Sequence, residues 1–305
     1  MAEREDNFTK LGDLVFFGQY PTYLEKNKDR IEELNALAGK LPMKGAPGKW
    51  TSYGYYIDGE PNDFMWHIDI NPYEDRWYRG VYFTKPRPAS CAKVQRPDTP
   101  TQIENGYEPN NVYWFSLEDM WWKVIKEDEK SALLLANDII DAQAFYIPKE
   151  EGNRTINGKE ICQNNYVYSD IRRWLNKDFL DYAFTKSEKK RIQKVVVDNS
   201  DPDNRFACEN TEDHIFLLSC QEVEELFKDL SDRRVSTTDY AQCQGALTGQ
   251  KDTYVDGQGQ WWLRTPDDLY GNCTRFVDQM GNCGLLNEYV NHTTTGILPA
   301  MIINL

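Results

Sequence analysis

The chain has 305 residues, a formal net charge of -14 at pH 7 and a sequence pI near 4.8. This acidity argues against nucleic-acid binding, because phosphate contacts need clustered Lys and Arg side chains. Apolar residues make up 40% of the chain and aromatic residues 13%, which excludes global disorder, and no apolar run approaches the roughly 20 residues that span a bilayer.

Sequence patterns in the first third of the chain predict one strand, one helix and an irregular region. Residues 11–22 are typical of a strand that ends at a Gly/Pro turn. The spacing of charged and apolar residues over 23–38 favours a short helix. Residues 39–111 are rich in Gly, Pro, Tyr and Trp without a helical period. We therefore expect irregular, strand-containing structure there, held by aromatic side chains.

A hairpin is predicted next. Residues 112–116 and 121–126 favour strands, because they are rich in aromatic and β-branched side chains. A charged turn at 127–130 then leads into the apolar residues 131–136, which completes the hairpin pattern.

Capping patterns predict the helix starts in the middle of the chain. Ser169 is a suitable N-cap for a helix that begins at Asp170. Thr185 to Glu188 and Ser219 to Glu222 both match the capping box. Residues 195–197 and 214–218 favour strands.

Two pairs of adjacent tryptophans lie in predicted strands, at 121–122 and 261–262. Successive side chains of a strand point to opposite faces. We therefore expect one Trp of each pair to lie in the core and its neighbour to lie on the opposite face.

The sequence gives little support for a metal site or a known catalytic motif. The three histidines (His67, His214 and His292) are far apart, and none of the seven cysteines forms a C-x-x-C pair. Two Glu-Pro-Asn triplets, at 60–62 and 108–110, match the triplet with which some C-type lectins bind calcium and sugar. Both lie far upstream of the expected calcium loop, and no Trp-Asn-Asp partner follows. We expect no cofactor.

The segment from residue 261 to residue 305 points to recognition. It begins with the rigid sequence Trp261 to Pro266 and ends with the apolar sequence Gly296 to Leu305. Between these two sequences lie polar and aromatic side chains that are suited to contact: Asp267, Asp268, Tyr270, Asn272, Thr274, Asp278, Asn282, Asn287, Tyr289, Asn291, His292 and Thr294. We predict that they form a ligand-binding surface.

Eight motifs in order resemble a widespread bacterial and phage domain family of unassigned function, whose members end in a WWLRSP…G…GVRPA pattern. The motifs are Phe17-Gly18-Gln19-Tyr20-Pro21, Tyr113-Trp114-Phe115, Trp122-Lys123-Val124-Ile125, Ala132-Leu133-Leu134-Leu135, Ser169 to Phe184, Asp213 to Glu222, Trp261 to Pro266 and Gly296 to Ala300. The resemblance implies a C-type lectin-like (formylglycine-generating-enzyme-like) α+β fold. It also implies a single domain over residues 1–305. In that domain an irregular, aromatic-rich part (1–111) precedes a lectin-like core (112–305) with a display segment (261–305).

The same family includes variable proteins of diversity-generating retroelements, in which adenine-directed mutagenesis rewrites a carboxy-terminal cassette. The resemblance therefore implies a non-catalytic binding protein with exchangeable contact residues, whose ligand is an unknown protein or a surface glycan. The scaffold of this surface would be Trp261, Trp262, Arg264, Gly281, Gly296 and Pro299. Leu298 stands where the family pattern has Arg, so this chain lacks that cation.

Two alternative functions remain open at this stage. A formylglycine-generating oxidase would use Cys273 and Cys283 as a redox or copper pair, and a structural component of a phage or surface assembly would need no site at all. The amino-terminal residues 1–6 are polar and acidic, unlike a signal peptide. The expected location is cytoplasmic, or phage-particle or surface-associated by a non-classical route.

Overall fold

The computed structural model describes residues 10–57, 60–73, 76–91, 101–149, 152–249, 257–284 and 286–305, with the backbone alone at 55–57 and 60–62. These residues form helices and mainly antiparallel sheets, which places the protein in the α+β class that the sequence predicts. The amino-terminal residues 1–9, on which the signal-peptide expectation rests, lie outside the described part. No helix of the described residues is long and apolar enough to cross a membrane.

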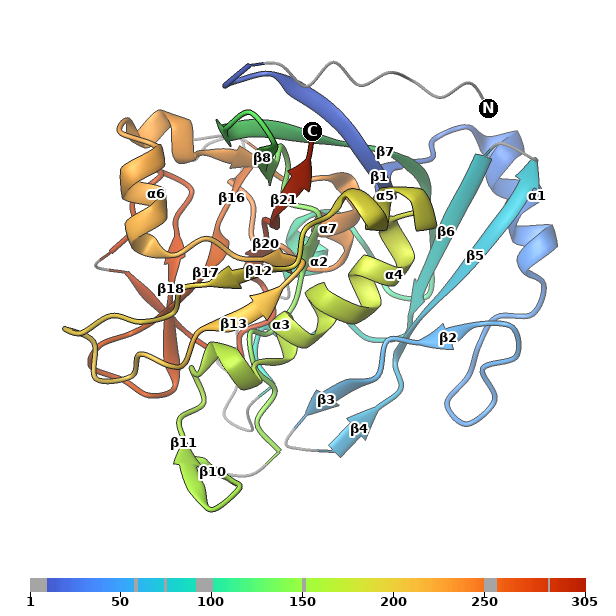
Figure 1. Cartoon of the computed structure of the whole chain (residues 1–305). Helices are drawn as coiled ribbons and strands as arrows, with labels where there is room; N and C mark the ends of the chain where they lie inside the picture. The colour runs from blue at the N-terminus through green and yellow to red at the C-terminus, as the bar shows by residue number, and fades with distance from the viewer. Residues whose placement is uncertain are drawn as a thin grey trace.

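The largest sheet has eight strands and joins the two ends of the chain. Its order is β14-β21-β8-β7-β6-β5-β2, with β1 paired to β7, and every pairing is antiparallel. The strands are β1 (Leu14–Leu24), β2 (Thr51–Ser52), β5 (Met65–Tyr73), β6 (Arg76–Phe83), β7 (Val112–Glu127), β8 (Ser131–Ala136), β14 (Ile215–Phe216) and β21 (Ala300–Asn304). The carboxy-terminal strand β21 therefore lies inside this sheet, beside β8 (Figure 1).

A second sheet of five strands carries the predicted display segment. Its order is β19-β18-β17-β20-β9, and only β17 and β20 are parallel. The strands are β9 (Asp141–Ala142), β17 (Trp261–Pro266), β18 (Cys273–Val277), β19 (Asn287–Tyr289) and β20 (Gly296–Ile297). In Figure 1, β17 and β18 lie on the opposite side of the molecule from β5 and β6.

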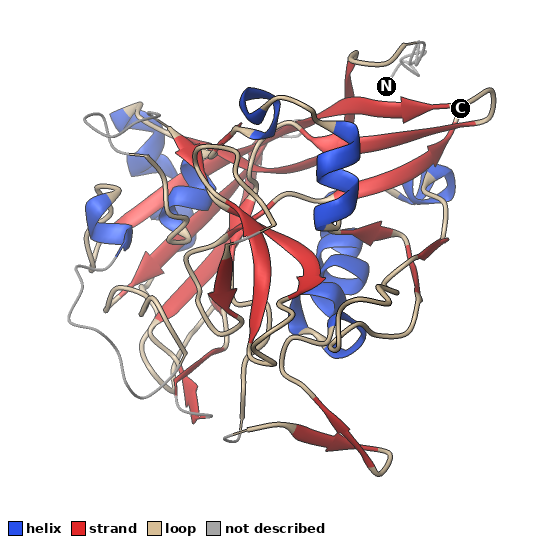
Figure 2. Ribbon diagram, turned by 90° about the vertical axis from the view of Figure 1, so that its left-hand side faces the viewer, coloured by secondary structure: helices blue, strands red, loops and turns tan. Residues whose placement is uncertain are grey.

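Four small ribbons, seven α-helices, two 3₁₀ turns (Tyr166–Tyr168 and Leu230–Arg233) and one π-helical turn (Leu175–Phe179) complete the described fold. Figure 2 shows helices on either side of the strands. The ribbons are β3 (Tyr55–Ile57) with β4 (Glu60–Asn62), β10 (Arg154–Ile156) with β11 (Lys159–Ile161), β12 (Val195–Val197) with β13 (Thr211–Asp213), and β15 (Val235–Ser236) with β16 (Gln258–Gly259). The helices are α1 (Lys28–Ala38), α2 (Thr101–Glu104), α3 (Asp170–Trp174), α4 (Leu180–Ala183), α5 (Lys186–Arg191), α6 (Cys220–Leu226) and α7 (Asp239–Cys243).

The predicted helix starts are confirmed by their hydrogen bonds. The Ser169 side chain accepts from the Arg172 amide at the start of α3. Thr185 and Ser219 each form a complete capping box, which fixes the starts of α5 and α6. Local hydrogen-bonding capacity therefore decides where these three helices begin.

A π-helical turn joins α3 to α4 because one side chain intervenes in the backbone hydrogen bonding. The Asn176 amide group donates to the carbonyls of Arg172 (3.1 Å) and Ile215 (2.8 Å), and its oxygen accepts from the His214 amide (2.8 Å). A side chain inserted into the helical hydrogen-bond ladder is a usual cause of such a distortion. The result ties this helix to the segment that leads into β14.

The strands expected within the region 39–111 are confirmed, but β5 and β6 are regular and form a long hairpin in the large sheet. Both faces of this hairpin are covered. Trp66 and Tyr82 pack in a small core with α1, whereas Met65 and Phe83 point into the main core. β5 alternates apolar and polar residues from Trp66 to Asn71, a strand pattern that lies within Gly- and Pro-rich surroundings.

The predicted strands 112–116 and 121–126 are a single strand, β7. The intervening Glu118 and Asp119 resemble a turn in the sequence, but both are paired with β1 and only partly exposed. The predicted hairpin with residues 131–136 is confirmed as β7 and β8.

The two tryptophan pairs behave differently. Trp122 is fully buried and its neighbour Trp121 is 40% exposed, as predicted. Trp261 and Trp262 are both fully buried, so the expected division between core and surface is wrong for this pair. Trp262 Nε1 donates to the Gln143 carbonyl (2.9 Å), and Trp261 Nε1 donates to the Arg233 carbonyl (3.2 Å), so β17 is covered on both faces.

Candidate functional site

The buried Arg264 on β17 holds together the predicted scaffold of the display segment, which we call the frame. Its guanidinium group pairs with both carboxylate oxygens of Glu222, at 2.8 Å for Nη2 to Oε1, and also donates to the carbonyls of Leu217 (2.8 Å) and Asp198 (3.0 Å). Glu222 is at the same time the acidic member of the Ser219 capping box. Arg264 therefore fixes α6 against the second sheet.

Two glycines of the predicted scaffold stand where no other side chain fits. Gly281 has a φ of +87°, and a Cβ atom there would lie 2.0 Å from the Leu230 carbonyl oxygen. A Cβ atom on Gly296 would lie 2.4 Å from Cγ2 of Ile139. The Pro299 carbonyl accepts from the Ala136 amide (2.9 Å) and so links the end of the segment to the large sheet.

Asp267 and Thr274 are corrections to the predicted contact set, because both are fully buried. Asp267 accepts from the amides of Leu269 and Tyr270 and from the Asn287 side chain, each at 2.8 Å. Burial would raise the pKa of Asp267, but these hydrogen bonds and the nearby Arg275 lower it overall. Thr274 Oγ1 donates to the Thr265 carbonyl (2.7 Å). Both side chains shape the loop instead of contacting a ligand.

Asp278 organises the next loop. It accepts from the amides of Met280 (2.9 Å) and Asn282 (2.8 Å) and from the Asn282 side chain (2.9 Å). An aspartate that bonds to amides further along the chain stabilises a turn. Asp278 is partly buried in this role, whereas Asn282 stays exposed.

Five predicted contact residues are exposed close to one another, and we call them the display face: Asp268, Tyr270, Asn272, Asn287 and Tyr289. Tyr270 is 56% exposed and Tyr289 is 51% exposed.

Strand pairing brings the display face together. In the β18–β19 ladder Tyr289 pairs with Cys273, next to Asn272, and Asn287 pairs with Arg275. Arg275 in turn forms an ion pair with Asp268. The display face is thus a single patch at the edge of the second sheet.

The last three predicted contact residues are half-buried and lie in the connection from β19 to β20. His292 Nδ1 lies 2.9 Å from a carboxylate oxygen of Glu288. The carbonyls of Asn291 and Thr294 accept from the amides of Cys91 and Leu247. This connection is therefore tied to distant parts of the chain, and the His292 ring lies beside the display face, 5.7 Å from the Tyr289 ring between centroids.

The cysteine pair that the oxidase alternative needs does not form a site with shared partners. The Cys273 thiol is buried against the Asn272 side chain (3.7 Å), and burial raises the pKa of Cys273 to about 12. Cys283 instead lies beside Cys220 and Glu224. Side chains of the triplet 60–62 lie outside the described residues. Among the described residues, the only group of three or more potential metal ligands is Cys220, Glu224 and Cys283.

A cavity of about 700 Å³ lies between the amino-terminal strands and α3, α4 and α7, and no sequence pattern pointed to it. Its wall includes Tyr20, His67, Arg79, Asp141 and Tyr240, which come from five different elements. The volume is within the range of small-molecule sites.

Most of the polar groups in the cavity wall satisfy one another. Arg79 forms a two-pronged pair with Asp69 (2.7 Å for both contacts), and Tyr20 donates to Asp141 (2.7 Å). Burial raises the pKa of both Tyr20 and Asp141. His67 differs, since its Nδ1 atom is buried with no hydrogen-bond partner among the described residues. Burial, followed by the charge of Arg79, lowers the pKa of His67 to about 4.

The low pKa of His67 predicts an acid-sensitive fold. Its pKa is about 4 when folded, against an ordinary value of 6.5. The unfolded chain therefore binds the extra proton first, so the stabilisation is complete above pH 6.5 and is lost as the pH falls toward 4. Between pH 7 and pH 4.5 this loss is about 2–3 kcal/mol. Urea unfolding at both pH values should show a smaller decrease for His67→Gln than for the wild type. Equal decreases would contradict the assignment.

Comparison with known proteins places the chain in a family. Residues 129–305 match the family model described as Domain of unknown function (DUF6273), and because this match covers more than half of the chain, the protein belongs to that family. No curated protein and no solved structure matches the chain. The match begins in the turn between β7 and β8. The family segment therefore shares its large sheet with strands that precede it.

Proposed function

We propose that the protein is a non-catalytic ligand-recognition protein, whose contact surface is the display face on a C-type lectin-like frame. It would act like the variable protein of a diversity-generating retroelement, with contact residues that can be exchanged while the frame stays fixed. The observation that carries the proposal is the division of roles within one segment. Trp261, Trp262 and Arg264 on the central strand β17 are buried, and the display face at the edge of the same sheet is exposed.

The chemistry of the display face suits a protein or a surface glycan. Two exposed tyrosine rings offer a large contact area at a low cost in side-chain entropy, and the Asn and Asp side chains offer adaptable hydrogen bonds. Rings such as Tyr270 and Tyr289 are also suited to the centre of a contact surface, where few residues contribute most of the binding energy.

The topology supports a lectin-like frame. Within the family segment the first strand, β8, pairs with the last strand, β21, over five residue pairs. The chain between them is thereby closed into a loop that returns to its starting point. A closed loop of this kind can carry irregular surface residues without depending on them for its stability.

The central test exchanges the display face. Replacing Asp268, Tyr270, Asn272 and Tyr289 by other polar and aromatic residues should leave the free energy of unfolding within about 1 kcal/mol, because exposed substitutions have small effects. Asn287 is kept, because its side chain donates to the buried Asp267. Binding to a glycan array and to a library of cell-surface proteins should change its profile. Thermal unfolding and the two binding screens measure both expectations.

A matched control separates display from folding. Asp267→Ala and Thr274→Ala lie in the same segment but remove buried hydrogen bonds, so each should lower stability by about 1–3 kcal/mol. Collapse of the fold on exchange of the display face, or a binding profile that does not change, would contradict the proposal. A nearby copy of the coding segment that differs only at adenines, beside a reverse-transcriptase gene, would support the retroelement part.

A further inference from the structure

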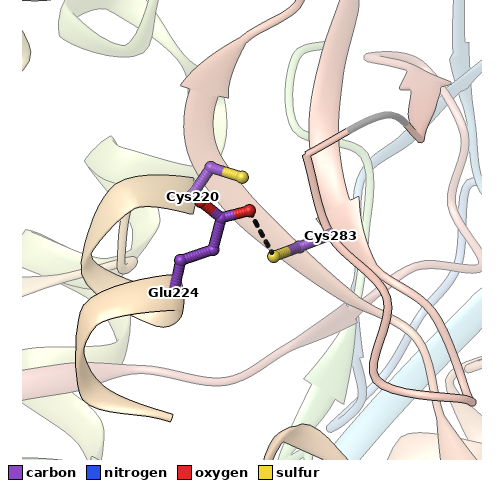
Figure 3. A group of neighbouring side chains, drawn as sticks. All are labelled: Cys220, Glu224 and Cys283. Atoms are coloured by element: carbon purple, nitrogen blue, oxygen red, sulfur yellow. Dashed lines mark hydrogen bonds between the residues drawn. The ribbon is translucent and has the colours of Figure 1, made fainter. Parts of the chain in front are cut away.

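Three potential metal ligands from two distant parts of the chain meet beside α6. Cys220 and Glu224 belong to α6, and Cys283 follows Gly281 in the loop after β18. One ligand atom from each residue lies within 4.8 Å of the others, and Cys283 Sγ lies 3.7 Å from Glu224 Oε1. In Figure 3 both α6 side chains point toward the Cys283 thiol. In a tetrahedral zinc site with bonds of about 2–2.3 Å, ligand atoms lie about 3–4 Å apart, so only a small closure is needed.

The helix presents its two ligands in a fixed arrangement. Cys220 and Glu224 are four residues apart, so they lie on one face of α6. The Cys220 amide donates to Thr265 Oγ1 (2.9 Å), and Glu222 on the same helix is held by Arg264. The position of the two ligands is therefore set by the buried frame.

The loop after β18 also holds the third ligand, Cys283, in a defined position. Gly281 packs against the Leu230 carbonyl so closely that it excludes any Cβ atom. A Cβ atom on Gly284 would lie 3.2 Å from Glu224 Oε1 and 3.6 Å from Cys220 Sγ, so glycine backbone forms part of the wall of the site. Because residue 284 is a glycine, the space between the ligands stays free of a side chain from this position.

The charges of the site favour a divalent cation. Cys283 Sγ donates to Glu224 Oε1 (3.7 Å), and Arg233 Nη1 lies 3.4 Å from the same sulfur. With both thiols ionised, the two sulfurs and the Glu224 carboxylate carry three negative charges, and Arg233 offsets one. The two that remain match the charge of one divalent ion.

We propose that Cys220, Glu224 and Cys283 bind one Zn²⁺ ion, with a water molecule at the fourth position. Two thiolates and one carboxylate are ligands that Zn²⁺ accepts at tetrahedral sites, and sulfur ligands disfavour Mg²⁺ and Ca²⁺. Binding releases the remaining thiol protons to solvent, with no change of oxidation state. The ion fastens the loop that carries Asn282 to α6. The site is independent of the ligand of the display face.

The test uses the full chain, reduced and stripped of metal by a chelator, and then titrated with Zn²⁺ against a chromophoric competitor. We expect one ion per chain by elemental analysis after gel filtration. Cys283→Ser and Cys220→Ser should each weaken binding about 100-fold or more, and Glu224→Gln about 10-fold. Cys273→Ser is the matched control and should bind like the wild type. Co²⁺ should give a thiolate-to-metal absorption band in the wild type that is weakened in Cys283→Ser.

Several outcomes would overturn the proposal. Zinc uptake by Cys283→Ser equal to that of the wild type would do so, and so would the absence of stoichiometric uptake by the reduced protein. The second result, combined with rapid formation of a Cys220–Cys283 disulfide in air, would assign the pair to thiol oxidation instead. Cys283 lies in a surface loop, so its variant remains informative if Cys220→Ser does not fold. The display-face screens require no zinc, so the two proposals can fail separately.

Discussion

Arg264→Ala is expected to lower the free energy of unfolding by about 3 kcal/mol, because it removes the charge partner of Glu222 and the donor to the carbonyls of Leu217 and Asp198. Arg264 itself is only 3% exposed, so little water can replace the lost contacts. Urea unfolding followed by near-ultraviolet circular dichroism would measure the loss.

Two further variants show which part of the Arg264 contact matters. Arg264→Lys keeps the charge but loses the planar fork that holds both carboxylate oxygens, so it should remain well below wild-type stability. Glu222→Gln also weakens the capping box of α6, and its effect should not add fully to that of Arg264→Ala because the two residues share one network. A loss below about 1 kcal/mol for Arg264→Ala would show that the pair does not hold the frame.

Trp261→Ala and Trp262→Ala are each expected to cost about 3–5 kcal/mol, the usual range for large buried aromatic side chains. Both tryptophan side chains are fully buried, with 0% solvent exposure. Each substitution also removes an indole hydrogen bond, to the Arg233 carbonyl for Trp261 and to the Gln143 carbonyl for Trp262. The fold should therefore be sensitive to both members of this pair.

The other tryptophan pair provides an internal control. Trp122→Ala should cost about 3–5 kcal/mol, whereas Trp121→Ala should cost about 1 kcal/mol or less, because Trp121 is 40% exposed and packs mainly on Phe16. Denaturant unfolding of the four variants would compare the pairs directly. If Trp261→Ala or Trp262→Ala lowered the free energy of unfolding by only about 1 kcal/mol, that result would contradict the burial of both faces of β17.

The sequence predicts those parts of the fold that are determined locally. The Ser219 capping box and the β7–β8 hairpin depend on residues within a few positions of one another, and both are confirmed. The position of the β5–β6 hairpin was missed although Trp66 to Asn71 alternate between apolar and polar residues, because the Gly- and Pro-rich surroundings favoured irregular structure. Likewise, the burial of both Trp261 and Trp262 depends on carbonyls far away in the chain.

The candidate site shows the same limit. Composition located the display segment, but it could not distinguish the exposed Asp268 from the adjacent, fully buried Asp267. An aspartate whose oxygens accept from two amides and an Asn side chain looks the same in the sequence as one that faces solvent. The proposed zinc ligands were missed because Glu224 and Cys283 are 59 positions apart. The cavity was missed because residues from many separate elements line it.

The position of β21 has a genetic consequence. This last strand lies between β14 and β8, and Ala300, Met301 and Ile303 are fully buried. A stop codon or frameshift anywhere in the coding segment for residues 267–299 would remove the strand and leave β8 with an open hydrophobic edge, which favours unfolding and degradation. If this segment is rewritten by mutagenesis, translation to the final strand becomes the condition for folding. Defective copies would thus be eliminated before they are displayed, and the surviving repertoire would consist of in-frame proteins.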